Sequence, residues 1–343
     1  MSESLIYLAF AVVVVLPMLP GLLEILFRKD DGALPIDESY MRDPRYLGKS
    51  LREKVRALAG KATVGVRMQF LGRRREYARV VSGIELPNDS RYEDVLLSRG
   101  AVVAGNGVTL LDVYAEDKVA IGANARLRTL AADGEASIGG GVRLQRWADA
   151  ECNLTVGPDG NLGQSASSAQ RLTVGSNVRF RRLFGRPVVI GSSSSVSALP
   201  PVGAPERVAM IACGGRNHVV SAHDVTEGET LDGDVIASGT VHVGAKATLK
   251  GSIKSGGDIA IGPGARVLGN LVARGSVLID RGAVVFGHVF AEERVTLQPG
   301  AVVGTAALPK TAYGGRSMRL AVGSCIFGWV ITEGDGETFV ADA

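Results

Sequence analysis

Histidine and cysteine, which often act as general base, reactive thiol or soft-metal ligand, are few in this 343-residue chain. They are four histidines and three cysteines: His218, His223, His242, His288, Cys152, Cys213 and Cys325. The cysteines are far apart and form no CxxC pair, so their spacing indicates neither a disulfide framework nor a zinc site. GxSxG, HExxH and phosphate-loop motifs are also absent. We therefore predict no catalytic residue, no metal and no cofactor.

Two basic segments could bind an anionic partner. The stretches "VRLQRW" (142–147) and "VRFRRLFGR" (178–186) lie 36 residues apart. Their candidate contact residues are Arg143, Arg146, Trp147, Arg179, Arg181, Arg182 and Arg186. Together they could form a basic ledge for an anionic glycan, a lipid headgroup or an acidic protein segment, although a charged, solvent-facing ridge is the commoner explanation on a β-helix.

A third basic cluster lies closer to the N-terminus, in "GRRREYAR". Near a membrane, arginines of this kind attract anionic lipid headgroups; here they are Arg73, Arg74, Arg75 and Arg79. A solvated face that only enforces topology is the alternative.

No aromatic residues alternate with these arginines and the whole chain carries a net charge of only +3, so we expect no nucleic-acid partner. In the same region, Ser50 and Glu53 fit a capping box that would begin a short helix ending at Gly60.

The N-terminal segment from Leu5 to Phe27 contains a single charged residue, Glu24. At about 1.5 Å per helical residue, its length suits a hydrocarbon core about 30 Å thick. A cleaved signal peptide is the alternative, but "MSES" lacks a basic residue. Basic residues cluster after the segment and not before it, which places the bulk of the chain in the cytoplasm. We expect a single-pass protein of the inner (cytoplasmic) membrane.

The segment 243–302 is built from six-residue units whose first and fifth residues are apolar, apart from Ser255. Such spacing indicates a short strand followed by a turn. In every third unit the fifth residue is an alanine: Ala247, Ala265, Ala283 and Ala301. Glycines recur at the third position, where the chain can bend: Gly251, Gly257, Gly269, Gly275 and Gly287. The repeat is therefore 18 residues long and contains three short strands.

Eighteen-residue coils that stack like residues in columns are typical of a parallel β-helix. Aliphatic residues at intervals of 16 to 18, most of them followed by glycine, continue the pattern back to Val103, so twelve coils are possible. The composition, rich in glycine and aliphatic residues with 5% aromatics, agrees. The sequence predicts a mainly β chain, a parallel β-helix preceded by one N-terminal transmembrane helix.

The stretch "LDGDVIASGTVHVGAKATLKGSIKSGGDIAIGPGARVLGNLVARGSVLIDRGAVVFGHVFAEERVTLQPGAVVG" resembles the core of the bactofilins, bacterial polymer-forming cytoskeletal proteins. The resemblance is clearest over residues 225–304. It implies a right-handed, triangular β-helix that assembles end to end without nucleotide, lies beneath the cytoplasmic membrane and recruits envelope-building enzymes. The membrane span and the irregular first set of coils depart from the compact single β-helix that the family usually has.

These patterns divide the chain into six parts. We expect a transmembrane anchor (1–28), a basic juxtamembrane region with a short helix (29–95), irregular β-helix coils (96–199), a proline-rich join (200–224), a regular bactofilin-like β-helix (225–304) and a C-terminal segment (305–343). The C-terminal segment either closes the last coil or associates with another subunit. Its candidate self-association residues are Ile326, Phe327, Trp329 and Val330.

The predicted function is a membrane-anchored cytoplasmic scaffold or cytoskeletal protein without enzymatic activity. Its expected partners are further copies of itself, the membrane and proteins of envelope synthesis. A hexapeptide-repeat acyltransferase is one alternative, but His242 and His288 are 46 residues apart, which is not a multiple of 18, so they should lie on different faces. A β-helix module that binds anionic polysaccharide is the other alternative. Secreted modules of this kind tend to have aromatic platforms and an export signal, and the sequence shows neither.

Overall fold

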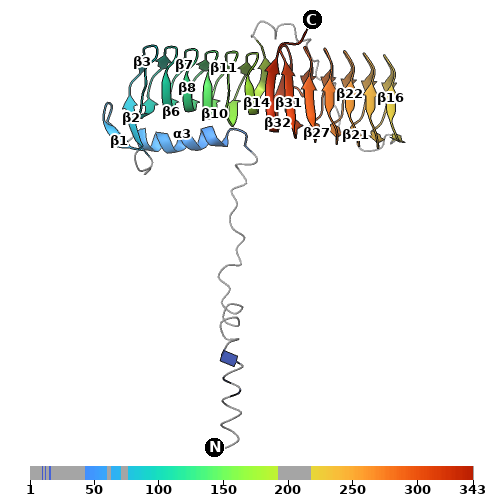
Figure 1. Ribbon diagram of the computed structural model, residues 1–343, viewed down its shortest axis with the longest axis horizontal. Helices are drawn as coiled ribbons and strands as arrows, with labels where there is room; N and C mark the ends of the chain where they lie inside the picture. Colours follow the sequence, from blue (N-terminus) through green and yellow to red (C-terminus); the bar gives the residue numbers. More distant parts are fainter. Residues whose placement is uncertain are drawn as a thin grey trace, which may run out of the picture. The chain divides into compact units, whose positions relative to one another are not determined.

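The computed structural model describes residues 43–59, 63–70, 76–191 and 218–342, together with Phe10, Val12, Val15 and Leu16. The chain divides into two compact units, Met1–Asp43 and Pro44–Ala343. The second unit contains one described helix, α3 (Tyr46–Ala59), and 32 strands that all belong to one hydrogen-bonded sheet (Figure 1).

The strands form two β-helices within this unit. The first contains β1 (Arg67–Gln69), β2 (Tyr77–Val81), β3 (Ile84–Leu86), β4 (Val95–Ser98), β5 (Val102–Ala104), β6 (Thr109–Ala115), β7 (Val119–Ile121), β8 (Arg126–Ala132), β9 (Ala136–Ile138), β10 (Arg143–Ala150), β11 (Leu154–Val156), β12 (Ser165–Ser168), β13 (Leu172–Val174) and β14 (Arg179–Ile190). The second contains β15 (His218–Val220), β16 (His223–Val225), β17 (Thr230–Leu231), β18 (Val235–Ala237), β19 (Val241–Val243), β20 (Thr248–Leu249), β21 (Ile253–Ser255), β22 (Ile259–Ile261), β23 (Arg266–Val267), β24 (Leu271–Ala273), β25 (Val277–Ile279), β26 (Val284–Val285), β27 (Val289–Ala291), β28 (Arg294–Leu297), β29 (Val302–Val303), β30 (Lys310–Gly314), β31 (Ser317–Ala321) and β32 (Cys325–Phe339).

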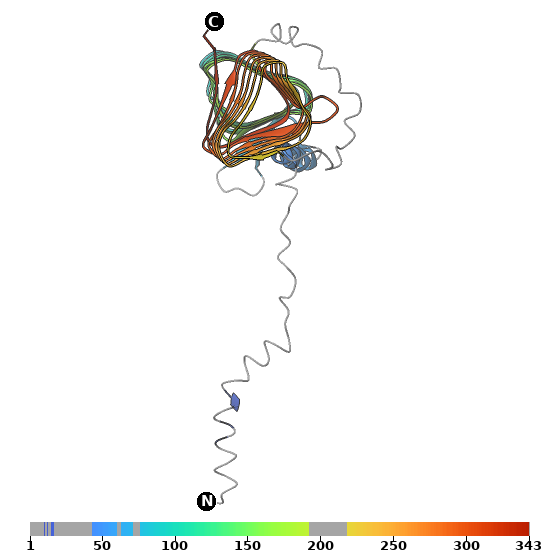
Figure 2. The same cartoon turned by 90° about the vertical axis from the view of Figure 1, so that its right-hand side faces the viewer.

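The predicted fold class is confirmed as a mainly β, parallel solenoid of about 13 turns with about 18 residues per turn. Successive coils stack in register, as in the row Val241, Ile259, Val277 and Val295. Viewed along the axis, the coils are triangular (Figure 2). The inward alanine column is fully buried: Ala247, Ala265, Ala283 and Ala301. The 18-residue period therefore reflects one side chain per coil at each position of a dry, narrow core.

Glycine has two separate roles in the coils, and only one of them was anticipated. Gly264 and Gly282 have φ values of 68° and 67°, so they form turns that other residues adopt at a cost. Gly251, Gly269 and Gly287 do not have positive φ. A Cβ on Gly269 would lie 2.4 Å from the carbonyl carbon of Gly251 in the coil below. The third-position glycines that we expected to allow bends instead allow the backbones of adjacent coils to approach closely.

The strand boundaries differ from the predicted division of the chain. Strands β1 to β3 precede residue 96, where the first coils were expected to begin. Strand β15 lies within the expected join and β16 begins in it, so the second β-helix begins at His218. The C-terminal segment from 305 contributes β30, β31 and β32. Both β-helices therefore contain more of the chain than the hexad pattern indicated.

The two β-helices meet through their last coils. Strand β14, which ends the first β-helix, pairs antiparallel with β32, which ends the second. Pairs lie on all three faces of the triangle, for example Arg179 with Glu337, Leu183 with Val330 and Val189 with Cys325. We call this β14–β32 pairing the seam. The strands of the two β-helices consequently run in opposite directions, and both outer ends are N-terminal coils (Figure 1).

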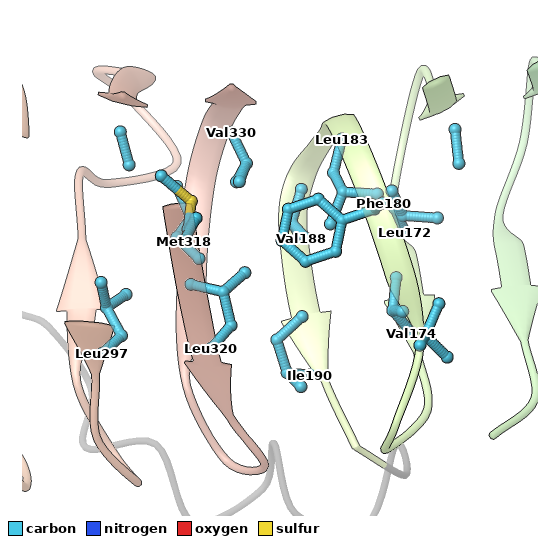
Figure 3. Packing of buried hydrophobic residues seen from close by; sticks show 14 of the residues in the cluster. Leu172, Val174, Phe180, Leu183, Val188, Ile190, Leu297, Met318, Leu320 and Val330 are labelled. Atoms are coloured by element: carbon cyan, nitrogen blue, oxygen red, sulfur yellow. The ribbon is translucent and has the colours of Figure 1, made fainter. Parts of the chain in front are cut away.

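Apolar side chains from both β-helices fill the core at the seam (Figure 3). Phe180, Leu183 and Val188 of β14 are buried and face the last coils of the second β-helix. Met318 and Val330 lie opposite and are fully buried as well. All of these residues belong to one core cluster that runs through both β-helices. The seam is therefore closed by backbone hydrogen bonds outside and by apolar contact inside.

Helix α3 covers one face of the first β-helix. On that face, Val80, Leu97 and Tyr114 occupy the same outward position of β2, β4 and β6. Outward apolar side chains need a cover, and Val55 of α3 packs against this row. The helix begins at Tyr46, four residues before the expected cap at Ser50, and directly after Arg45, whose side chain binds Asp149 of the β-helix.

Further along α3 the apolar contact is replaced by a buried ionic cluster. The next member of the outward row beyond Ala131 is Asp149, which is fully buried. Arg45 donates to both of its carboxylate oxygens at 2.9 and 2.8 Å, and Arg52 donates to the same carboxylate. Arg52 also donates to Asp133 at 2.9 Å. Each buried charge thus has a partner, which removes most of the cost of desolvation.

Within the described part of the chain, no helix is long and apolar enough to cross a membrane. The predicted span from Leu5 to Phe27 lies outside the described residues, apart from Phe10, Val12, Val15 and Leu16, which are helical.

The ionic cluster predicts unequal effects for two arginines on the same helix. Arg52→Ala leaves Asp149 with one guanidinium fewer in a buried site, and should lower the free energy of unfolding by about 3 kcal/mol. Arg56, whose side chain is 57% exposed, also pairs with Asp133, yet Arg56→Ala should cost less than about 1 kcal/mol. Urea unfolding of both variants measures the two losses of unfolding free energy. Equal losses would contradict the stronger role of the buried Arg52 side chain.

Candidate functional site

The outer end of the second β-helix is an open sheet end. Strands β15, β16 and β17 each pair with a strand of the next coil and with no described strand on their other side. The His218 N–H donates to Asp234 and the His223 N–H to Thr240, both toward the next coil. Because the direction of backbone groups alternates along a strand, the N–H and C=O of Val219 and Asp224 point away from the molecule. We call β15–β17 the open end.

The other outer end, at the start of the first β-helix, is partly covered. Strand β1 lies antiparallel on β2 and occupies one face of the triangle there. Arg67 on β1 forms an ion pair with Asp94 at 2.8 Å and stacks over the Tyr77 ring. Short strands and charged side chains discourage further strand pairing at a sheet edge. The open end of the second β-helix is therefore better suited to accept another chain.

The predicted self-association residues lie at the seam. Ile326 and Val330 are fully buried in the core, and Trp329 is paired with Phe184 of β14 across the seam. Phe327 is half-buried beside the cluster that includes Cys325. These side chains therefore close the last coil against the first β-helix of the same chain. Burial also raises the pKa of the Cys325 thiol to about 12, so this thiol stays protonated at neutral pH.

The predicted basic ledge is only partly assembled. Arg143 and Arg179 lie in one outward row of the first β-helix, with Asn161 between them. Trp147 does not belong to the ledge, since it is 9% exposed and packs in the cluster beneath α3. Arg186 lies farther along β14, with its guanidinium 5.8 Å from the centre of the Phe184 ring. Arg146, Arg181 and Arg182 are exposed.

The structure adds Arg126 to this row, directly beside Arg143 in the preceding coil. Arg126 lies 17 residues before Arg143, which is about one coil. This spacing was the sequence signal that could have added Arg126 to the ledge. All three row arginines, Arg126, Arg143 and Arg179, are exposed, and no carboxylate among the described residues forms an ion pair with them. We call these three residues the arginine row.

The predicted lipid-headgroup cluster cannot be placed as a group, because Arg73, Arg74 and Arg75 lie outside the described residues. Arg79 lies on β2, where its guanidinium is 3.4 Å from the Asp94 carboxylate. That carboxylate also pairs with Arg67. Arg79 is therefore engaged within the protein.

The histidines do not converge on a common point. His242 is on β19, whereas His288 precedes β27 on a different face, where its Nδ1 accepts the Thr311 N–H at 3.1 Å. Burial, and then the nearby charge of Lys310, lower the pKa of His288. His218 and His223 stack at the open end with ring centres 6.0 Å apart. Across the described ranges, no group of three or more His, Cys, Asp or Glu side chains could hold a metal ion.

Parallel coils stacked around a dry core define a β-helix protein. Comparison with protein families agrees: the model described as "Bactofilin: Polymer-forming cytoskeletal" matches residues 224–311. The matched residues make up most of the second β-helix, which is therefore similar to a bactofilin domain. The resemblance predicted over 225–304 is confirmed. Neither the curated proteins nor the solved structures contain a significant match to the chain.

The seam predicts that a destabilising substitution on β32 also lowers the stability of β14. Val330→Asp would place an unpaired charge in the core, at a cost of several kcal/mol. Hydrogen exchange should then accelerate in β14 as well as in β32, although the two are joined only by the seam. Ile331→Asp, one residue later on the outward side, should leave β14 protected. Unchanged protection of β14 in the Val330 variant would contradict the seam.

Proposed function

We propose that this chain is a membrane-anchored cytoskeletal scaffold that self-associates through the open end and positions envelope-building proteins at the cytoplasmic membrane. The observation that carries the proposal is the complete open end of the second β-helix. On all three faces of the coil, the outer side of these strands pairs with no strand that the structure describes. Exposed sheet edges of this kind recruit further strands.

A second copy of the chain fits this end. Two copies related by a two-fold axis would pair β15, β16 and β17 antiparallel with the same strands of the partner, which is an isologous contact. The seam is a precedent, since it joins two β-helix ends by antiparallel pairs on three faces. Val219, at 73% exposure the most exposed large apolar side chain of the described strands, would be covered in such a contact.

The anchoring part of the proposal is supported by sequence. The segment from Leu5 to Phe27 contains one charged residue, and basic residues follow it. The positioning of envelope-building proteins is supported by the bactofilin resemblance. A scaffold of this kind needs binding surfaces and no reaction centre, in keeping with the dispersed histidines.

Proline substitutions at the open end test self-association. Val219→Pro with Asp224→Pro removes the two outward N–H groups and leaves the bonds that β15 and β16 make to the next coil. A two-fold contact would lose four donors, which should weaken association on the order of a hundredfold. Light scattering of the detergent-solubilised chain over a range of concentrations measures the effect.

The matched control is Val219→Thr with Asp224→Asn, which keeps both N–H groups. This control should associate like the unaltered chain. If the proline variant and the control have the same mass at every concentration, the open end is not the site of self-association.

A reporter fusion tests the anchor. An enzyme reporter that works only in the cytoplasm should be active after Ala343, and removing residues 1–28 should release the fusion from the membrane fraction. Activity of a periplasm-only reporter at the same position would overturn the proposed orientation.

A further inference from the structure

The arginine row brings like charges into direct register on one face of the first β-helix. Arg126 and Arg143 are paired neighbours on β8 and β10, and Arg179 lies two coils beyond Arg143. Adjacent strands are about 4.8 Å apart, and like charges directly opposite each other destabilise a sheet. A neutralising partner would relieve this repulsion.

The same row is neutralised internally on the other side of the seam. There the next member after Arg179 is Glu337, followed by Arg319. The Arg319 guanidinium and the Glu337 carboxylate form an ion pair at 2.6 Å. The second β-helix therefore supplies a counter-charge next to Arg179, whereas Arg126 and Arg143 have no ion-pair partner among the described residues.

Further cationic side chains border the row. Arg146 on β10 and Arg181 and Arg182 on β14 are exposed, and none has an ion pair with a described residue. The arginine row thus lies on one face of the triangular coil, whereas Arg182, which pairs with Ile331 beside the Leu183–Val330 pair, belongs to the adjoining face. A flat cationic surface is matched by a flat anionic one better than by a narrow chain that must be enclosed.

We infer that this face docks on the anionic phospholipid headgroups of the membrane. The inference rests on the proposed anchoring. The compact unit begins at Pro44, and Arg45 contacts Asp149 and Ala150 on β10, the strand that also carries Arg143. Only residues 28–43 separate this point from the predicted span, a length that reaches at most about 55 Å when fully extended.

The tethered geometry raises the effective concentration of the arginine face at the membrane surface. A basic residue near an anionic leaflet gains attraction that falls off within a Debye length, about 8 Å at physiological salt. Removing three such residues should lower the ratio of docked to undocked molecules on the order of a hundredfold. The face toward the membrane would then be fixed by charge, and the face that α3 leaves uncovered would remain available to partners.

The test uses the full chain in lipid nanodiscs that carry a dansyl-labelled headgroup. The only two tryptophans, Trp147 and Trp329, serve as native energy donors, and both lie on strands next to the arginine face. Transfer should be stronger in discs of phosphatidylcholine with phosphatidylglycerol than in phosphatidylcholine alone. High salt, or the triple variant Arg126→Gln, Arg143→Gln and Arg179→Gln, should reduce it to the neutral-disc level.

The matched control changes three exposed basic residues of the second β-helix: Lys254→Gln, Arg266→Gln and Arg274→Gln. It alters the net charge equally and should leave transfer unchanged. Equal transfer in both disc types, or a triple variant that behaves like the unaltered chain, overturns the docking. The second result is also expected if the arginines bind an acidic protein.

Failure of the anchor would look different. A chain that enters neither type of disc overturns the proposed anchoring. The arginine row is then judged by sedimentation with preformed phosphatidylglycerol vesicles. Loss of sedimentation in the triple variant supports the docking, and unchanged sedimentation overturns it.

Discussion

The structure depends on the pairing of backbone groups at the edges of coils. A parallel coil bonds to the coil above and the coil below, so a β-helix always ends in unpaired N–H and C=O groups. Two β-helices in one chain have four such ends. The seam pairs two of them with each other, and β1 partly covers a third. The open end at β15–β17 is the one that remains fully exposed within the described residues.

The first β-helix differs from the second in the side chains on its outward surface. Its row of Val80, Leu97 and Tyr114 is apolar and needs α3 as a cover, and the buried cluster at Asp149 fixes that helix in register. The helix also connects the β-helix to the N-terminal segment. Burial, and then the hydrogen bond to Asp133, raise the pKa of Tyr114 to about 12.

The inward columns could be predicted because each coil must place an apolar side chain at the same point. That rule identified Ala283 and its neighbours, and the fold class followed. The seam could not be predicted, since antiparallel pairing uses backbone groups common to all residues and joins Leu183 to Val330 without any sequence period. Trp147 was assigned to the ledge because it follows Arg146, but α3 covers its position. Such a contact depends on where a distant helix packs.

Joining two β-helices by their last coils decides how strand direction changes from one extremity to the other. A single β-helix has a direction, because its first and last coils differ. Here the seam reverses that direction halfway, so the rod presents a first coil at each extremity. Strand direction alone therefore does not distinguish the two extremities. What distinguishes them is their cover, since β1 lies over the start of the first β-helix and no described strand lies over β15–β17.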